Sequence, residues 1–402
     1  MNVSPTSRPT GLDIYRTAVA MRSFEHAAAT RNAAESIVVR LRLADGREGY
    51  GQTLPREYVT GEDLQSVPAD IEQTIWPRLL ANWDSLLGGT AADRGAGVLP
   101  ANIAAIPAAH DSLADIIPAS DVSGRCINSA ACCVELACLD ALAWQEGRAP
   151  ARAIVSRVSG VLGSANPQKT AKRLRLMRLF GLRDFKLKLG FGDALDDTNL
   201  RIIHDGIGKR LQAGTCSLRV DVNGGWDVAS TPERVAALAK HHVCVVEQPV
   251  YCSAAELVKL AGRCKLPLMA DESLLTLADA NVLLSEPRIW WNIRISKNGG
   301  LLRAKALANL AAAHGVPYVI GCMVGESGLL SAAQRRLLQL VSPPRFVEGN
   351  YGRLLLADDL TEGSPRFGYA GRLKPLRRPG LGISVNPKKL AKYGTLIKTL
   401  TA

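Results

Sequence analysis

The 402-residue sequence contains no uninterrupted apolar run that reaches the roughly 18 residues needed for a membrane-spanning helix. Its most apolar helical segment, residues 129–144, carries Glu135 and Asp140, which indicates a buried helix. The N-terminal stretch 1–13 also lacks the apolar core of a secretion signal. We therefore predict a cytoplasmic protein that has no membrane partner.

The sequence also lacks the cysteine and glycine patterns of several common sites. Its nine cysteines include no Cys-x-x-Cys pair, and their odd number leaves at least one of them unpaired. Free thiols in a reducing compartment explain this pattern better than a zinc site does. No glycine-rich phosphate loop opens any of the predicted helices.

Acidic residues are missing from two segments, and this explains the sign of the formal net charge of +12. Residues 371–402 hold eight Lys and Arg residues and no acid, and residues 148–183 hold nine more and no acid. A basic tail and a solvated helix face are sufficient explanations for the two segments. We therefore predict no nucleic-acid partner.

Residues 1–150 are predicted to form an α+β domain. Residues 12–54 have the patterns of β-strands, with an Asp45-Gly46 hairpin turn between two strand-like runs. Residues 64–147 have mostly helical patterns.

Short apolar strands alternate with amphipathic helices from about residue 153 onward. Capping-box spacing at Ser230–Glu233 and at Ser253–Glu256 marks two helix starts, and Gly315 marks a helix end. Eight such alternations predict a parallel α/β barrel of the TIM type over residues 151–375. The strand candidates are residues 152–162, 184–190, 216–223, 243–249, 266–273, 288–297, 316–323 and 344–350.

Three carboxylates follow three consecutive strands of this barrel. Asp221, Glu247 and Asp271 lie at the ends of the third, fourth and fifth strands, one βα unit apart. Because the carboxyl ends of the strands meet on one face of such a barrel, we expect these side chains to converge. Three oxygen ligands suit Mg²⁺, with water and substrate completing its shell, and the lack of His and Cys argues against zinc.

Three lysines occupy the second and sixth strands. Lys186 and Lys188 lie two places apart on one face of the second strand, and Lys297 ends the sixth. Strands two and six of eight lie across the barrel from each other, so Lys188 and Lys297 would face a metal-bound substrate from opposite sides. Lys186 would lower the pKa of Lys188 by repulsion and leave it available as a base near pH 7.

In these motifs the chain resembles the enolase superfamily, specifically its muconate-lactonizing-enzyme subgroup of muconate cycloisomerases and mandelate racemase-like proteins. The segments "AACCVELACLDALAW" and "DVNGGW" are also similar to that family. The resemblance implies a capping domain at residues 1–150, a modified TIM barrel, (β/α)₇β, at 151–375, and a C-terminal segment at 376–402 that returns to the cap. We also expect a homo-oligomer.

The resemblance also indicates where a small carboxylate substrate would bind. Residues 55–62 are similar to the lid of the dipeptide epimerases of this subgroup, and we expect them to close over the substrate together with residues 22–31. After strand seven, "GCMVGES" has one residue more than the family's Gly-x-Met-x-Glu-Ser, and after strand eight "EGN" replaces the epimerases' Asp-x-Asp. The candidate substrate residues are Phe24, His26, Arg31, Arg56, Tyr58, Glu326, Glu348 and Asn350.

These features predict a Mg²⁺-dependent isomerase that abstracts a proton α to a carboxylate through an enediolate. Bases on both faces favour a racemase or epimerase of amino-acid derivatives or dipeptides. A muconate-type cycloisomerase and an o-succinylbenzoate synthase-like syn-eliminase would use the same residues with one base active, so both remain alternatives. A non-catalytic, basic binding protein that has kept the barrel is the alternative from a different class.

Overall fold

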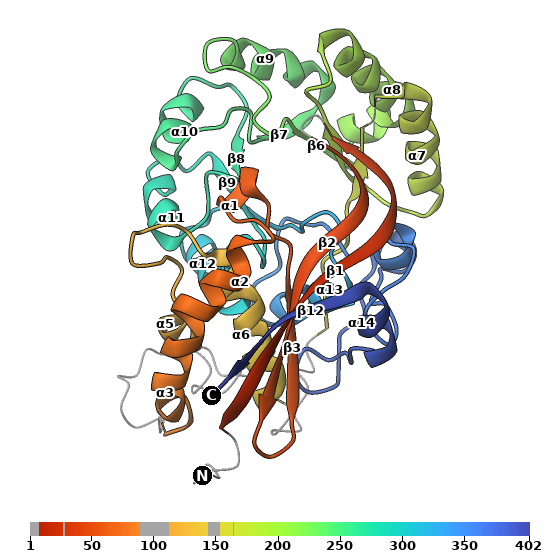
Figure 1. The fold of residues 1–402 in the computed structure, drawn as a ribbon. Coiled ribbons are helices and arrows are strands. Elements are labelled where there is room, and N and C mark those ends of the chain that lie inside the picture. Colours follow the sequence, from red (N-terminus) through yellow and green to blue (C-terminus); the bar gives the residue numbers. More distant parts are fainter. Residues whose placement is uncertain (1–7, 27–28, 89–111, 144–152, 164) are drawn as a thin grey trace.

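The computed structural model describes residues 8–26, 29–88, 112–143, 153–163 and 165–402 (Figure 1). One of its two sheets is antiparallel, with the strand order β12-β1-β2-β3. It consists of β1 (Pro9–His26), β2 (Ala29–Leu43), β3 (Glu48–Thr53) and, from the other end of the chain, β12 (Gly394–Thr401). The predicted hairpin turn is confirmed, because β2 pairs with β3 and Gly46 between them has a φ of 83°.

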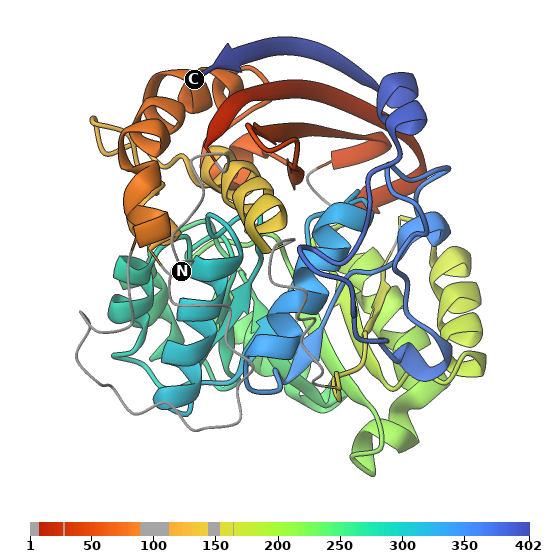
Figure 2. The ribbon, with the colours of Figure 1, turned by 90° about the horizontal axis from the view of Figure 1, so that it is seen from below.

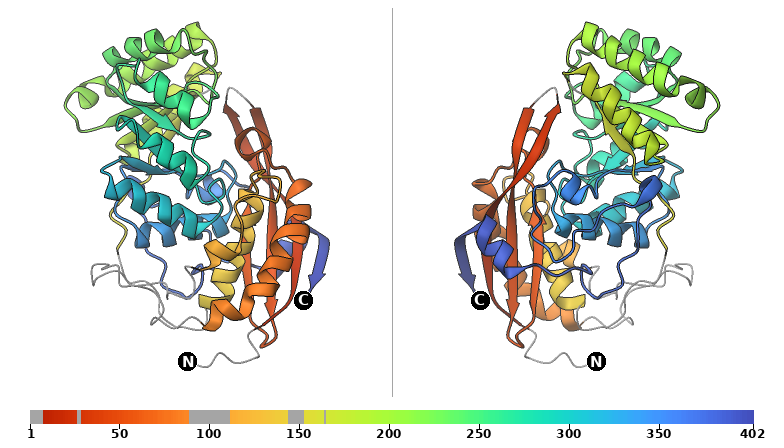
Figure 3. Two further views of the ribbon diagram at one scale, coloured as in Figure 1. Left: turned by 90° about the vertical axis from the view of Figure 1, so that its left-hand side faces the viewer. Right: turned by 90° about the vertical axis from the view of Figure 1, so that its right-hand side faces the viewer.

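Helix α6 (Asn128–Ala143) packs against this sheet, and glycines in β3 allow the close approach. A Cβ on Gly51 would lie 1.8 Å from the carbonyl oxygen of Cys133, which real structures do not tolerate. Further helical segments lie beside the sheet (Figure 3). They are α1 (Glu57–Thr60), α2 (Ser66–Asp70), a π-helical turn (Ile71–Ile75), α3 (Trp76–Gly88) and α5 (Leu113–Ile116).

The second sheet has eight parallel strands in sequence order, and the predicted barrel is confirmed. Val158, just before the first strand, forms a parallel bridge with Val347 of the last strand. The amide of Ser159 donates to the carbonyl oxygen of Val347 over 2.8 Å, so the sheet closes on itself. The strands are β4 (Gly160–Leu162), β5 (Asp184–Lys188), β6 (Ser217–Asp221), β7 (Val243–Glu247), β8 (Leu268–Ala270), β9 (Ile289–Ile293), β10 (Tyr318–Ile320) and β11 (Phe346–Val347).

Helices follow the strands and surround the barrel (Figure 1). They are α7 (Pro167–Leu179), α8 (Asp193–Gln212), α9 (Thr231–Leu238), α10 (Ala254–Ala261), α11 (Leu277–Leu283), α12 (Leu301–Ala313) and α13 (Gly328–Leu340), with α14 (Pro387–Tyr393) leading into β12. None of the helices in the described ranges is both long and apolar enough to cross a membrane.

The structure confirms two of the three predicted helix signals and contradicts the third. The capping box at Ser253 forms, with Ser253 and Glu256 bonded reciprocally. Gly315 follows α12 in the left-handed region, with a φ of 66°. The predicted capping box at Ser230 is wrong, because the Ser230 hydroxyl donates to the carboxylate of Asp227 instead.

The antiparallel sheet lies along one side of the barrel (Figure 2). The amide of Leu54, just after β3, donates to Ser296 Oγ over 3.1 Å. Asn128, at the start of α6, donates from Nδ2 to the carbonyl oxygen of Lys297 over 2.9 Å. These contacts fix the loop that carries Lys297 against the first sheet.

Candidate active site

The register of three neighbouring strands places the predicted site residues side by side. Lys188, the last residue of β5, pairs with Asp221, the last residue of β6, and Asp221 pairs with Glu247 at the end of β7. All three side chains are buried. The carboxyl end of this part of the barrel therefore carries a dense group of charges with little access to water.

Lys186 lies one pleat deeper than Lys188, and carboxylates enclose its amine. Its Nζ lies 2.9 Å from Asp221 Oδ2, 2.9 Å from Glu247 Oε1 and 3.0 Å from Glu348 Oε1. Burial disfavours the charged amine, but the three carboxylates outweigh burial and raise the pKa of Lys186 above its ordinary value. Lys186 is therefore a fixed positive charge.

Lys188 shares one of these carboxylates with Lys186. Its Nζ donates to Asp221 Oδ2 over 2.6 Å and to Asn223 Oδ1 over 2.7 Å. Burial works against a charged Asp221, yet the two lysines hold the pKa of Asp221 well below its usual range. The two ammonium groups are tolerated on one face of β5 because a carboxylate oxygen contacts both of them.

Arg294, which directly follows β9, brings a further positive charge to the site. Its Nη2 contacts Asp271 Oδ2 and lies 3.6 Å from Glu247 Oε1. The same Glu247 oxygen accepts a hydrogen bond from Asn292 Nδ2 over 2.8 Å. A guanidinium therefore connects the carboxylates at the ends of the fourth and fifth strands.

Lys297 is fully buried and contacts Asp271 at Oδ1, whereas Arg294 contacts Oδ2. Its Nζ donates over 2.6 Å to the Asp271 carbonyl oxygen, over 2.8 Å to the Asn292 carbonyl oxygen and over 3.0 Å to Asp271 Oδ1. Burial lowers the pKa of Lys297 well below its ordinary value, and the nearby charge of Arg294 lowers it further. Of the two lysines predicted to act as bases, Lys297 thus occupies an environment that favours the neutral amine.

The donor chemistry of the site fits a hard divalent cation, although the side chains do not surround one as they stand. Glu247 Oε2 and both carboxylate oxygens of Glu272 are buried without a hydrogen-bond partner. In the described ranges, however, no three His, Cys, Asp or Glu side chains are gathered closely enough to hold a metal ion. The reason is visible in the contacts above: Lys186 and Arg294 lie between the three predicted ligands.

The predicted lid residues have different surroundings. Tyr58, on α1, is one of the residues that line a cavity beside the barrel. Arg56 is buried and donates to the carbonyl oxygens of Pro55 and Val324, so it connects the segment predicted to be a lid with the loop after β10. The side chains of Phe24, His26 and Arg31 lie outside the part of the chain whose side chains the structure describes.

The three predicted substrate residues after the last strands are largely occupied by protein partners. Glu348 Oε1 accepts from Arg219 Nη2 over 2.6 Å in addition to its contact with Lys186. Asn350 Oδ1 accepts from Arg335 Nε over 2.8 Å. Glu326 Oε1 accepts from the Met323 amide over 2.7 Å, and burial raises the pKa of Glu326 to about 8.

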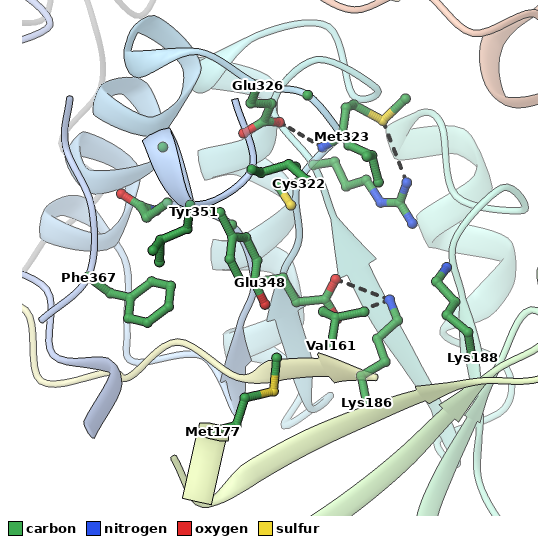
Figure 4. Close-up of a pocket in the computed structure, with 18 of the residues that line it drawn as sticks. Val161, Met177, Lys186, Lys188, Cys322, Met323, Glu326, Glu348, Tyr351 and Phe367 are labelled. Atoms are coloured by element: carbon green, nitrogen blue, oxygen red, sulfur yellow. Dashed lines mark hydrogen bonds and ion pairs between the residues drawn. The ribbon is translucent and has the colours of Figure 1, made fainter. Parts of the chain in front are cut away.

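A cavity of about 480 Å³ lies beside these residues (Figure 4). The side chains that line it at the strand ends are Lys186, Lys188, Asn223, Glu272, Arg294, Glu326 and Glu348. Further lining comes from Tyr58 of α1, from β4, from α7 and the turn that follows it, from residues 322–325 after β10 and from the loops after β11. The cavity therefore extends from the charged group to a set of largely apolar side chains.

Several residues of the site were not predicted from the sequence. Asn223 lies two places after Asp221, Glu272 directly follows Asp271, and Arg294 lies three places before Lys297. Their proximity to predicted residues was a usable signal. Arg219 lies two places before Asp221 on the same strand face, but the sequence does not indicate its partner, because Glu348 is 129 residues away.

The structure combines an eight-stranded α/β barrel with an α+β unit, and the ends of the barrel strands carry paired lysines and carboxylates. This arrangement is typical of barrel enzymes that have their active site at the carboxyl ends of the strands. The chain belongs to the family described as Enolase C-terminal domain-like, whose model matches residues 169–389, more than half of its length. It is an isomerase of the enolase superfamily, of the muconate-lactonizing-enzyme type.

Known proteins resemble the chain over nearly its whole length. It is 27% identical over 390 residues to an L-Lys-D/L-Arg epimerase of Methylococcus capsulatus, covering 94% of this chain and 95% of that protein. It is 26% identical over 376 residues to a hydrophobic dipeptide epimerase of Enterococcus faecalis, covering 90% and 95%. The crystal structure of muconate lactonizing enzyme from Pseudomonas fluorescens matches with a TM-score of 0.78 and 25% identity, covering 97% of this chain and 100% of that one.

Proposed function

We propose that this protein is a racemase or epimerase that removes a proton α to a carboxylate and returns one to the opposite face. The observation that carries the proposal is the placement of two buried lysines, Lys188 on the second barrel strand and Lys297 after the sixth. In an eight-stranded barrel these strands lie across from each other. Relatives named as amino-acid and dipeptide epimerases support an amino-acid derivative or a dipeptide as the substrate.

The two lysines supply the proton transfers. In one direction the amine of Lys297 takes the α-proton as the C–H bond breaks, and the ammonium of Lys188 gives a proton to the other face of the resulting enediolate. The reverse reaction exchanges the two roles, so atoms and charges balance. Asp221 and Asp271 hold the two amines through the contacts described above and fix their positions.

We also propose that the reaction depends on Mg²⁺. Asp221, Glu247 and Asp271 would hold the ion, which would supply positive charge for the substrate carboxylate as the α-proton leaves. The unpartnered oxygen of Glu247 and the all-oxygen donor set support this assignment. Lys186, as a fixed cation, orients Asp221 and Glu247 from below.

The alternatives use the same scaffold. Cycloisomerisation and syn-elimination need one active lysine, and similarity to a muconate lactonizing enzyme supports the first of them. A non-catalytic binding protein is disfavoured, because every predicted metal ligand and lysine is present and the similar curated proteins are isomerases.

The test is exchange of the substrate α-proton in D₂O, followed by NMR for each hand of a dipeptide or amino-acid derivative. We expect Lys188→Ala to abolish exchange from one hand and to leave measurable exchange from the other. Lys297→Ala should do the reverse, and net interconversion should vanish in both variants. If Lys297→Ala retains turnover while Lys188→Ala loses it, the enzyme uses one base, and the racemase or epimerase proposal is withdrawn.

A further inference from the structure

The cavity has an end that the proposed chemistry does not use. We define the apolar arm as the part lined by Val161 of β4, Met177, Phe180, Leu182, Tyr351 and Phe367. Figure 4 shows Met177 and Phe367 on the side of the cavity away from Lys188, with Glu348 and Lys186 between them. The arm thus begins where the charged group ends.

The walls of the arm are built from packed rings. Phe367 lies edge-on to Phe180, with ring centroids 5.9 Å apart, and edge-on to Tyr351 at 5.4 Å. The Tyr351 hydroxyl donates to the carbonyl oxygen of Ser159 over 3.0 Å, so its polar atom is already bonded within the protein. The arm is therefore a preformed apolar surface.

Met177 lies against Gly160 of β4 at the floor of the arm. A Cβ on Gly160 would lie 2.6 Å from Met177 Sδ, so the absence of a side chain at position 160 leaves room for Met177 to lie directly on β4. A change of size at Met177 alters the volume of the arm directly.

None of the six residues that define the apolar arm is acidic, so the arm itself gives a cationic occupant no ion-pair partner. The carboxylates that line the cavity follow strands β8, β10 and β11, and Glu348 among them is already paired with Lys186 and Arg219. The lining contributed by α7 includes one charged residue, Arg173, and it is a cation. An ammonium or guanidinium group in the arm would lose its hydration without gaining an acidic partner.

We propose that the apolar arm binds a hydrophobic substituent of the substrate, namely an aliphatic or aromatic side chain larger than methyl. The inference rests on the proposed function, because it assumes that the reacting carboxylate lies at the lysine end. It narrows the substrate class to hydrophobic amino-acid derivatives and dipeptides. Lys and Arg side chains are excluded from the arm.

The experiment measures α-proton exchange and binding for L-Ala-L-Phe, L-Ala-L-Ala and L-Ala-L-Lys, and for the matching N-acetyl amino acids. Exchange in D₂O gives kcat/KM, and titration calorimetry gives affinity. We expect kcat/KM for the Phe compounds to exceed that for the Ala and Lys compounds by about tenfold or more, the discrimination that a hydrophobic pocket gives. Met177→Trp, which fills the arm, should reduce the Phe-to-Ala ratio.

Leu179→Trp is the matched control, because Leu179 is on the same helix, 69% exposed and not in the lining. It should leave the Phe-to-Ala ratio of the natural chain unchanged. The preference of the natural chain is measured without any substitution, so the inference remains testable if Met177→Trp does not fold.

The outcomes separate the two proposals. Exchange at equal rates for all side chains, or a preference for Lys, overturns the apolar arm and leaves the racemase proposal standing. Tight binding of the Phe compounds without exchange supports the apolar arm and overturns the racemase proposal. If the compounds show no binding and no exchange, both proposals are overturned.

Discussion

Single residues decide how positive charge is distributed in this barrel. Lys186 contacts three carboxylates and stays charged, whereas Lys297 is buried and its pKa is lowered, first by burial and then by Arg294. The expectation that Lys186 lowers the pKa of Lys188 stays a prediction. The contacts show instead how the repulsion between them is relieved, since Asp221 Oδ2 lies within 3 Å of both amines.

Arg294 provides a prediction about metal binding. Its guanidinium contacts Asp271 and lies near Glu247, so a divalent ion held by these carboxylates would compete with it. Removing that charge in Arg294→Met should strengthen Mg²⁺ binding by about tenfold, which corresponds to ~1.4 kcal/mol. Titration calorimetry of the chelator-treated protein measures this without any substrate.

Glu247→Gln is the opposite control, because it removes one predicted ligand charge, and it should weaken Mg²⁺ binding. Chelator treatment should also abolish α-proton exchange, and added Mg²⁺ should restore it. Equal Mg²⁺ affinity in the natural chain, Arg294→Met and Glu247→Gln would show that the ion does not bind at these carboxylates.

Elements carry the site residues to their positions through register. The parallel pairing of β5, β6 and β7 aligns their last residues, although β8 has three residues and β11 only two. Helix α6 contributes from the other unit: Glu135 Oε1 accepts from the amide of Leu302 at the start of α12, over 3.0 Å. This buried bond joins the first unit to the barrel close to the loop that carries Lys297.

Glu135 predicts how this junction depends on pH. Burial raises the pKa of Glu135 to about 7, and Glu135 Oε2 has no hydrogen-bond partner. The pKa of Glu135 in the folded chain is above its ordinary value of 4.5. The contribution of Glu135 to the free energy of unfolding is therefore fully present below pH 4.5 and is lost as the pH rises through about 7. Glu135→Gln keeps an acceptor for Leu302 and removes this loss, so it should be the more stable form at pH 9, by up to about 3 kcal/mol.

Urea unfolding of both chains between pH 5 and pH 9 measures the effect. The advantage of Glu135→Gln should grow with pH, and Glu233→Gln, at an exposed position of α9, should show no such growth. A constant difference between Glu135→Gln and the natural chain at all pH values would contradict the prediction.

At the scale of the whole molecule, the sequence predicted the barrel and its charged end but not the apolar arm. The barrel is readable because each strand is a short apolar run and each site acid or lysine ends such a run, which is a local pattern. Met177, Tyr351 and Phe367 come from a helix and two loops that meet only after the barrel has closed. The same reason hides Arg219, because its partner lies across the barrel interior.

The distribution of charge over the whole molecule gives the last prediction. The basic segment 371–402 folds back onto acidic partners, with Lys389 paired to Asp358 and Lys398 to Glu72. The exposed cations of α7 lie on one helix of 13 residues, which offers a nucleic-acid backbone only a short contact surface. We therefore expect flat binding isotherms with single-stranded and duplex oligonucleotides at about 150 mM salt, and weak binding only at low salt, where phosphate contacts are least screened. Lys169→Glu combined with Lys172→Glu should remove even the low-salt binding, because it lowers the formal charge of α7 from +5 to +1. Sub-micromolar binding at 150 mM salt with a preference for one sequence would contradict this reading and would give the excess positive charge a function.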